Sequence, residues 1–272
     1  MKRYTLLIGV LLLFILNTIA QDITFSHLTT DNGLSHISVN AIYEDEKGFI
    51  WIGTREGLNF YADTYITTYK LQKNDPNSLF CNNVTRITGD RKGKVFLLCT
   101  EGVSEYDDSE EKFTTLLRGV DIGAICYYNQ LLIGQKNRIR TYNRETGEFE
   151  LYYQFQNKDI NISSLFFDNK GKLWVGSTNH GFFTLEKDKG NFTMNHPVTA
   201  GNIISIYQDS DDDIWIGSWS HGMFQITGEH IKVHLNDPAN PKSISTNFAR
   251  VCCEDNQGYI WIGTFLGLER YD

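Results

Sequence analysis

The chain has 272 residues, of which 41% are hydrophobic, and this apolar content is enough for a packed core. Intrinsic disorder is therefore excluded as the state of the whole chain. Aromatic residues make up 13%, and 23 glycines accompany only 4 prolines, a composition that favours β-structure. The formal net charge of −8 gives no general attraction to polyanions, so we expect no nucleic-acid partner.

The first twenty residues have the order of a secretory signal peptide. Lys2 and Arg3 precede an apolar run from Leu6 to Leu16, and Thr18 and Ala20 sit three residues and one residue before a cleavage site. We therefore predict a signal peptide over residues 1–20 and a periplasmic location. An uncleaved membrane anchor stays open as the alternative, although the run is short for a bilayer span. No second long apolar run follows, so we expect no membrane segment beyond the signal peptide.

The remainder of the chain is one motif repeated six times. Gly48-Phe-Ile-Trp-Ile-Gly-Thr returns near the end as Gly258-Tyr-Ile-Trp-Ile-Gly-Thr, and four weaker copies lie between them. The central hydrophobic position of the copies falls at residues 51, 96, 132, 174, 215 and 261, a period of about 42 residues. Repeats of this length are typical of propeller blades, whereas solenoid repeats, the alternative, are usually shorter.

Each repeat is predicted to form four short antiparallel strands. In the first repeat these are residues 39–45, 49–54, 58–61 and 65–71, separated by turns rich in Gly and Asp. The sequence therefore predicts an all-β fold, a β-propeller of four-stranded antiparallel blades, with six blades present. Two arrangements stay open, a complete six-bladed ring and an incomplete seven-bladed ring. We expect the Trp of each Trp-Ile-Gly strand to pack between blades, with the Gly leaving room for that contact.

The last repeat contains only three predicted strands. The segment Thr24–Leu28 is similar to the fourth strand of other repeats. We therefore expect it to complete the last blade, which would protect both exposed strand edges. Five cysteines, an odd number, occur without a CxxC pair, so we expect buried free thiols and neither a metal nor another cofactor.

The combined motifs Asp-x-x-Gly-x-Ile-Trp-Ile-Gly-Thr, Gly-Leu-x-x-Tyr and Asn-Asp-Pro-x-x-Ser-Leu resemble the two-component regulator propeller repeat. The resemblance covers residues 23–272 and is clearest in the first and sixth repeats, good in the fourth and fifth, and poor in the second and third. It implies that residues 21–272 form the periplasmic sensor region of a hybrid histidine kinase, a class that often responds to oligosaccharides. It also implies a ring of seven blades, so we expect a truncated member, with a standalone protein as the alternative. A homodimer formed through the propeller is a further possibility.

The turns between second and third strands are expected to share one face with the long loops that enter the next blade. Loops on a rigid scaffold commonly carry function, and this face would carry the candidate ligand-binding residues. These are Arg55, Glu56, His180, Trp219, His221 and Phe265. The aromatic side chains could stack on a sugar ring while the others bond hydroxyl groups. The alternative is that Trp219 packs on the neighbouring blade and that His180 and His221, in equivalent Ser-x-x-His-Gly turns, have a structural role.

The acidic cluster Asp209–Asp213 could suggest Ca²⁺, but it aligns with the Asp-x-x-Gly turns of other repeats and lacks the spacing of a calcium loop. We therefore predict a plain turn and no metal site. No phospho-acceptor, ATP-binding or hydrolase motif occurs, so we expect no catalytic residue in this chain. The favoured function is a carbohydrate-responsive sensor propeller of a two-component system. The alternatives are a secreted propeller glycosidase or lyase, and a protein-interaction scaffold.

Overall fold

The computed structural model describes residues 24–62, 65–188, 191–198 and 201–271. The predicted signal peptide lies outside these residues. The described part contains 23 strands and one short 3₁₀ turn, η1 (Thr30–Asn32). No described helix is long and apolar enough to cross a membrane.

The first unit follows the strand pattern expected from the sequence. It consists of β1 (Val39–Glu44), β2 (Ile50–Thr54), β3 (Gly57–Ala62) and β4 (Tyr65–Tyr69), paired antiparallel in chain order. The two central strands are the most buried, whereas β1 and β4 alternate between exposed and partly buried residues. This is the burial pattern of a sheet packed through its middle strands.

The same unit recurs five more times along the chain. The second and third units are β5 (Val84–Gly89), β6 (Lys94–Cys99), β7 (Gly102–Asp107) and β8 (Lys112–Arg118), then β9 (Ile122–Tyr128), β10 (Gln130–Gln135), β11 (Arg138–Asn143) and β12 (Glu148–Gln154). The fourth and fifth units are β13 (Ile162–Phe167), β14 (Leu173–Ser177), β15 (Phe182–Asp188) and β16 (Asn191–Val198), then β17 (Ile203–Gln208), β18 (Ile214–Ser218), β19 (Met223–Thr227) and β20 (His230–His234). The sixth unit has three strands, β21 (Ala249–Glu254), β22 (Ile260–Thr264) and β23 (Gly267–Tyr271), and a single residue pair joins β18 to β21.

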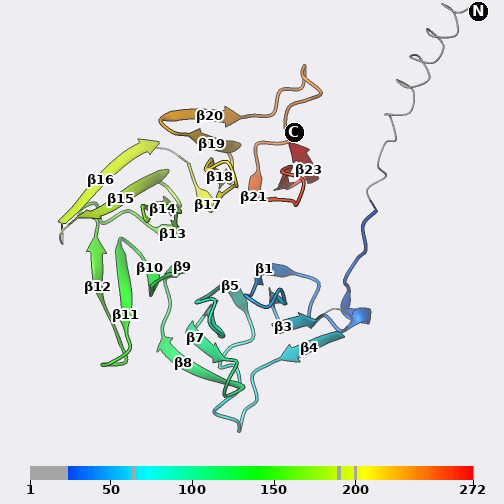
Figure 1. Cartoon of the computed structure of the whole chain (residues 1–272), viewed down its shortest axis with the longest axis vertical. Coiled ribbons are helices and arrows are strands. Elements are labelled where there is room, and N and C mark those ends of the chain that lie inside the picture. The colour runs from blue at the N-terminus through cyan, green and yellow to red at the C-terminus, as the bar shows by residue number, and fades with distance from the viewer. Residues whose placement is uncertain (1–23, 63–64, 189–190, 199–200, 272) are drawn as a thin grey trace, which may run out of the picture.

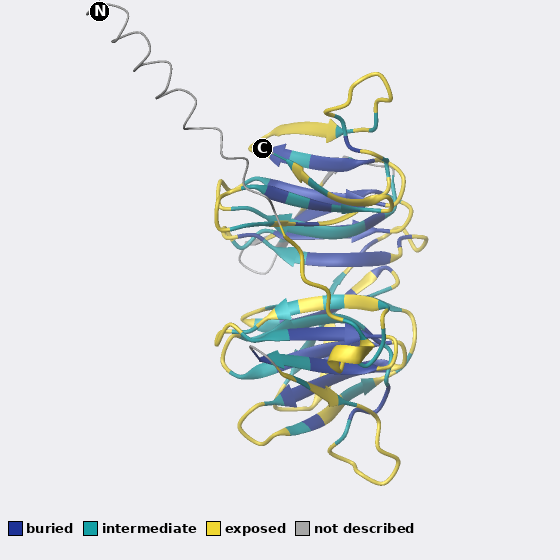
Figure 2. Ribbon diagram, turned by 90° about the vertical axis from the view of Figure 1, so that its right-hand side faces the viewer, coloured by how far each residue is buried: buried dark blue, intermediate teal, exposed yellow. Residues whose placement is uncertain are grey.

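The six units stand side by side along an arc, with their first strands towards its centre (Figure 1). Consecutive first strands contact one another from β1 through β5, β9, β13 and β17 to β21. The first and sixth units form the two ends of the arc and face each other across an opening (Figure 1). Buried residues concentrate within the strands and exposed residues in the turns (Figure 2). The expected all-β architecture of antiparallel, four-stranded blades is confirmed, and we call the units blades one to six.

A recurring hydrogen-bond pattern explains why the Asp-x-x-Gly turn precedes the Trp strand. In blade four, Asp168 Oδ1 accepts the backbone N–H groups of Lys170 and Lys172, and Oδ2 accepts the Trp174 indole N–H at 2.9 Å. The same Asp–Trp bond, six residues apart, occurs at Asp45–Trp51, Asp209–Trp215 and Asp255–Trp261. One carboxylate thus closes the turn and fixes the indole. Blade two keeps the turn through Asp90, but its Phe96 has no indole N–H, which accounts for the weak repeat there.

Trp51 and Trp215 pack between blades as expected, whereas Trp261 of the last blade meets Phe25 of the N-terminal segment. Trp51 lies 5.1 Å, centroid to centroid, from Tyr106 of blade two, and Trp215 lies 5.4 Å from Tyr271 of blade six. In blades one, three, four and five the glycine of the motif abuts the start of the next blade; at Gly176, for example, an added Cβ would lie 2.5 Å from Ile203 Cγ2. Side chains at these glycines would therefore push adjacent blades apart.

The expected closing strand at the N-terminus is wrong for the described residues. Residues 24–28 form no strand and do not join the sheet of β23. The segment nevertheless runs beside the last blade, where Phe25 packs edge-on against Trp261 with ring centroids 6.1 Å apart. The apolar side chains that make this segment similar to other fourth strands therefore contact the last blade, but its backbone does not pair with β23.

His234 lies in the interface between blades five and six and makes this interface sensitive to acid. Its ring stacks on Trp215 at 5.5 Å, meets Tyr271 edge-on, and bonds Gln225 through Nε2 at 2.9 Å. Burial, and to a smaller extent the charge of Lys232, lowers the pKa of His234 to about 4. An unfolded histidine has a pKa near 6.5, so between these values the unfolded chain binds a proton that the folded chain does not.

We therefore expect the folded state to lose stability as the pH falls from about 6.5 to about 4. Relative to a His234→Phe variant, which keeps a ring on Trp215, the native chain should lose roughly 2 kcal/mol across this window, allowing for partial solvent screening. Urea unfolding at several pH values measures the difference. Parallel pH profiles of the two proteins would contradict the assignment, and the exposed His230→Phe serves as the matched control.

Candidate functional site

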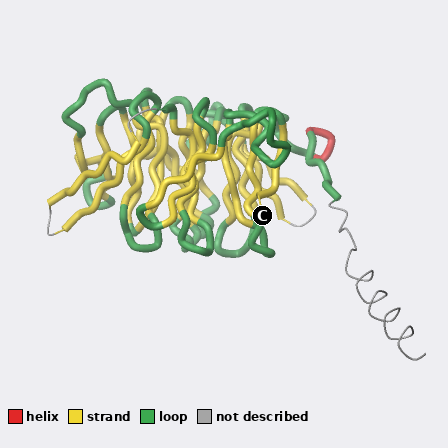
Figure 3. Tube along the Cα trace, turned by 90° about the horizontal axis from the view of Figure 1, so that it is seen from above, coloured by secondary structure: helices red, strands yellow, loops and turns green. Residues whose placement is uncertain are grey.

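The turns between second and third strands lie on one face of the arc, together with the loops that enter each blade. In five blades the turn donates a backbone N–H to the residue just before the first strand. These bonds join Arg55 to Ser38, Thr100 to Asn83, Thr178 to Asn161, Trp219 to Asn202 and Phe265 to Phe248. Seen from above, the loops gather along the two opposite edges of the arc (Figure 3). The shared loop face expected from the sequence is thus present, and we call it the loop face.

Two of the predicted residues meet in an exposed aromatic cluster on this face. Trp219, from the blade five turn, contacts Phe248 edge-on at 5.8 Å, and Phe248 contacts Phe265 of the blade six turn at 6.0 Å. Trp219 is 46%, Phe248 37% and Phe265 71% exposed. The Arg250 guanidinium lies 5.8 Å from the Trp219 ring centroid, within the range of a cation–π contact. We call Trp219, Phe248, Arg250 and Phe265 the aromatic cluster.

The backbone at His180 and His221 explains why the two turns are equivalent. The Ser177 hydroxyl accepts the N–H of His180 and donates to the carbonyl of Gly181, and Ser218 does the same for His221 and Gly222. The repeated Ser-x-x-His-Gly pattern therefore builds a turn through its serine. The His180 ring nitrogen Nε2 lies 3.0 Å from the Asn157 amide, and the His221 Nδ1 lies 3.0 Å from the Ser220 hydroxyl.

Arg55 and Glu56 form the exposed turn of blade one, at the other end of the arc from the aromatic cluster. The turn is closed by Thr54, whose hydroxyl accepts the Glu56 N–H and donates to the Gly57 carbonyl. Neither Arg55 nor Glu56 has a recorded contact with the cluster. The structure therefore brings Trp219 and Phe265 together, and leaves Arg55, Glu56 and His180 in other blades of the same face.

The acidic cluster of blade five is a turn, as predicted. Asp209 Oδ1 accepts the N–H groups of Asp211 and Asp213, and its Oδ2 is taken by the Trp215 indole. Within the described part of the chain, no group of three or more His, Cys, Asp or Glu side chains could hold a metal ion.

All five cysteines are free, and only Cys253 is exposed. The prediction of buried free thiols is therefore confirmed for four of them and wrong for Cys253. Burial raises the pKa of the Cys126 thiol to about 12, which keeps it protonated and unreactive.

Sequence reasoning missed Phe248 and Arg250 as members of the site. Phe248 ends the long loop into blade six, and Arg250 is the extra residue where the ladder between β21 and β22 shifts register, between Ala249 and Val251. Such β-bulges re-aim side chains, and a single sequence carries no signal for which direction results. The end of this loop lies beside the Trp219 turn because blades five and six pack against each other.

The fold is a β-propeller, because six antiparallel blades pack side by side around one axis. Its exposed residues gather in the turns, which form the loop face. The family described as two component regulator propeller matches this chain at residues 33–56, 156–179, 197–220 and 243–265. These four segments, which match the family's repeat, lie in the first, fourth, fifth and sixth blades. The second and third blades, where the motif is weakest, are not among the matches. No curated protein matches the sequence.

Solved structures with the same fold include extracellular parts of signalling proteins. The extracellular domain described as that of the hybrid two component system BT3049 from B. thetaiotaomicron is 20% identical, with a TM-score of 0.60, over 90% of this chain and 41% of that one. The corresponding domain of BT4673 is 19% identical, with a TM-score of 0.64, over 86% of this chain and 38% of that one. This chain therefore spans about two fifths of the length of these domains.

An enzyme has the same fold. Virginiamycin B lyase from Staphylococcus aureus is 17% identical, with a TM-score of 0.66, over 86% of this chain and 84% of the lyase. At these identities the likeness shows the fold alone, so activity must be argued from the residues of this chain.

Proposed function

We propose that this chain is the periplasmic, ligand-sensing propeller of a two-component system, and that its loop face binds a saccharide through the aromatic cluster. The repeat family supports the sensor role. The exposed rings of Trp219 and Phe265, which both contact the Phe248 ring, support the saccharide. This contact is the observation that carries the proposal, because rigid exposed rings provide large contact area for a sugar face at low entropic cost.

Signalling would follow if the ligand binds one conformational state of the sensor more tightly than the other. A ligand that prefers one arrangement of the propeller relative to its partner would shift the population of two signalling states. Any kinase that reads this shift belongs to a longer parent protein or to a partner.

The test is a panel of neutral oligosaccharides titrated by calorimetry, with the products separated afterwards. We expect saturable binding by at least one glycan and no turnover. Replacing Trp219 by Ala should weaken that binding about tenfold or more, as for other buried aromatic contacts at binding sites. The matched control is Tyr65→Ala, which removes a similarly exposed ring from β4 of blade one.

Three outcomes would overturn the proposal. If Trp219→Ala and Tyr65→Ala bind with equal affinity, the aromatic cluster is not the site. If the glycan is cleaved, the chain is a propeller hydrolase or lyase, the enzyme class that shares this fold. Failure of the whole panel would contradict the saccharide and favour a protein-interaction scaffold.

A further inference from the structure

One position in each blade lines the centre of the arc, and blade two differs from the others there. This position is the first residue after the register shift in the first strand of each blade. In five blades it pairs with the glycine of the motif on the second strand. The residues are Ala41, Ala124, Ser164, Ser205 and Val251, each paired with a glycine, whereas blade two pairs Arg86 with Leu98. Three of these residues, Ala124, Ser164 and Ser205, line one cavity together with Arg86, so small side chains face a single long cationic one there.

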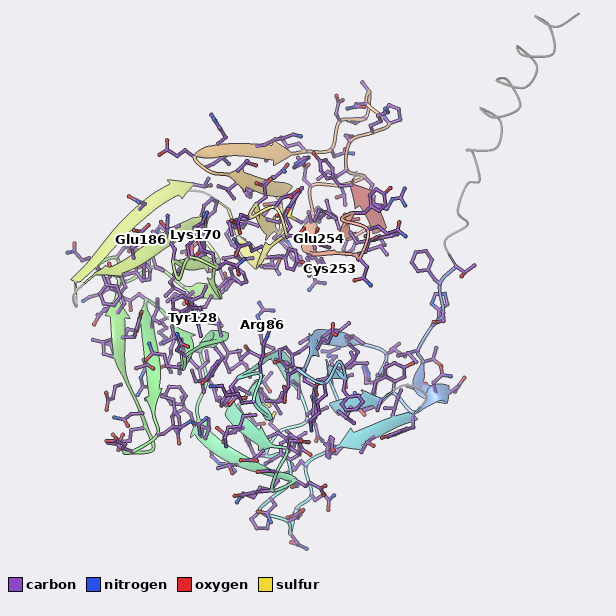
Figure 4. All side chains as sticks on the ribbon, viewed as in Figure 1. Arg86, Tyr128, Lys170, Glu186, Cys253 and Glu254 are labelled. Atoms are coloured by element: carbon purple, nitrogen blue, oxygen red, sulfur yellow. The ribbon has the colours of Figure 1, made fainter. Side chains whose placement is uncertain are left out.

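Arg86 reaches from β5 towards the centre of the arc (Figure 4). Its Nη2 donates to the carbonyl of Ser163 at 3.1 Å and to the carbonyl of Ile204 at 3.3 Å, in blades four and five. Ser163 and Ile204 are the extra residues at the register shifts of β13 and β17, so the ladder does not pair them. The guanidinium thus uses carbonyls that the bulges leave free.

The positive charge of Arg86 has no compensating anion. It forms no ion pair with any described carboxylate, and its Nε and Nη1 groups have no hydrogen-bond partner in the described part of the chain. Burial lowers the pKa of Arg86, and the positive charge of Arg250 acts in the same direction. Arg86 is partly buried, and a cationic group at such a site gains most from a charged acceptor, which the described part of the chain does not supply.

A cavity of about 180 Å³ adjoins the guanidinium. Arg86, Ala124, Ser164 and Ser205 lie in its wall, with Ile125 and Leu165 among the apolar residues. The Ser205 hydroxyl donates to the Arg250 carbonyl at 2.6 Å, whereas the Ser164 hydroxyl has no partner among the described residues. The volume is roughly that of six water molecules, which suits an oxyanion with its hydration and not an oligosaccharide.

We propose that this axial cavity binds an oxyanion, the carboxylate or sulfate group of a ligand, through the Arg86 guanidinium and the Ser164 hydroxyl. A guanidinium presents a planar fork of donors that matches carboxylate and sulfate oxygens, and its bonds to charged acceptors are the strong ones. The net negative charge of the chain does not oppose this, because no described carboxylate lies in the cavity wall. No residue of the aromatic cluster lies in the cavity wall, although Arg250 of that cluster adjoins it through Ser205, and the anion site does not depend on the saccharide proposal.

The first experiment titrates the native chain with sodium sulfate and with sodium glucuronate at constant ionic strength, with glucose as the neutral control. We expect saturable heat for at least one anion and none for glucose. Arg86→Met should weaken anion binding tenfold or more, since it removes the charged donor and keeps the unbranched aliphatic part of the side chain. Arg138→Met, which removes an exposed arginine from β11, should bind like the native chain.

The proposal is overturned if neither anion binds, or if Arg86→Met binds as tightly as Arg138→Met. In either case Arg86 only ties blade two to blades four and five. A second measurement needs no variant, in case Arg86→Met does not fold. Crystals of the native chain soaked in selenate should show an anomalous peak beside Arg86 and Ser164, and selenate density elsewhere alone would contradict the site.

Discussion

Replacing Gly176 by Ala is expected to lower the free energy of unfolding by about 2 kcal/mol, the range found for overpacked cores. The added Cβ would lie 2.5 Å from Cγ2 and 2.8 Å from Cβ of Ile203, which is fully buried at the start of blade five. A β-branched side chain has little freedom to move away, so blades four and five must separate slightly. Urea unfolding monitored by tryptophan fluorescence measures the loss.

Gly263 of blade six provides the matched control. It occupies the same place in the motif, but an added Cβ would meet only Val251 of its own blade, at 3.0 Å from Cγ1 and 3.7 Å from the carbonyl oxygen. Gly263→Ala should therefore cost little and could even stabilise, because alanine restricts the unfolded chain. Equal losses for the two variants would contradict the arc seen here, since they would mean that another blade packs against blade six.

Replacing Trp215 by Ala is expected to have the largest effect, a loss of about 4 kcal/mol, as for other large aromatic residues removed from a core. The side chain is 1% exposed and holds three contacts together: the Asp209 carboxylate at 2.7 Å, the ring of His234, and Tyr271 of the next blade. Because small proteins unfold at about 5–15 kcal/mol, this variant should be assayed well below its melting temperature.

The corresponding change at Trp261 should cost clearly less. Trp261 makes the same bond to its aspartate, Asp255, but the ring that it meets beyond its own blade is Phe25, which is 61% exposed. The difference between the two variants isolates what a neighbouring blade contributes. A loss at Trp261→Ala as large as that at Trp215→Ala would show that the N-terminal segment packs as firmly as a blade.

Much of the candidate site follows from local sequence. The turns of blades five and six could be located because the motif places them a fixed distance after each Trp, and their exposure follows from the hairpin. Which turns meet could not be predicted, because Trp219 and Phe265 lie 46 positions apart in the sequence and are joined by Phe248 from a third segment. Likewise, Arg55 and Glu56 are equivalent to them in sequence and lie at the far end of the arc.

The sequence by itself determined the repeat, the strand order within each blade and the closing Asp–Trp turn, because these depend on residues a few positions apart. Only the tertiary structure decided that Phe25 packs on Trp261 without pairing as a strand, and that Arg86 crosses to carbonyls of blades four and five. Both depend on how six blades are arranged around one axis. Three small residues at equivalent positions of the innermost strands, Ala124, Ser164 and Ser205, line the open cavity beside the partly buried Arg86 guanidinium.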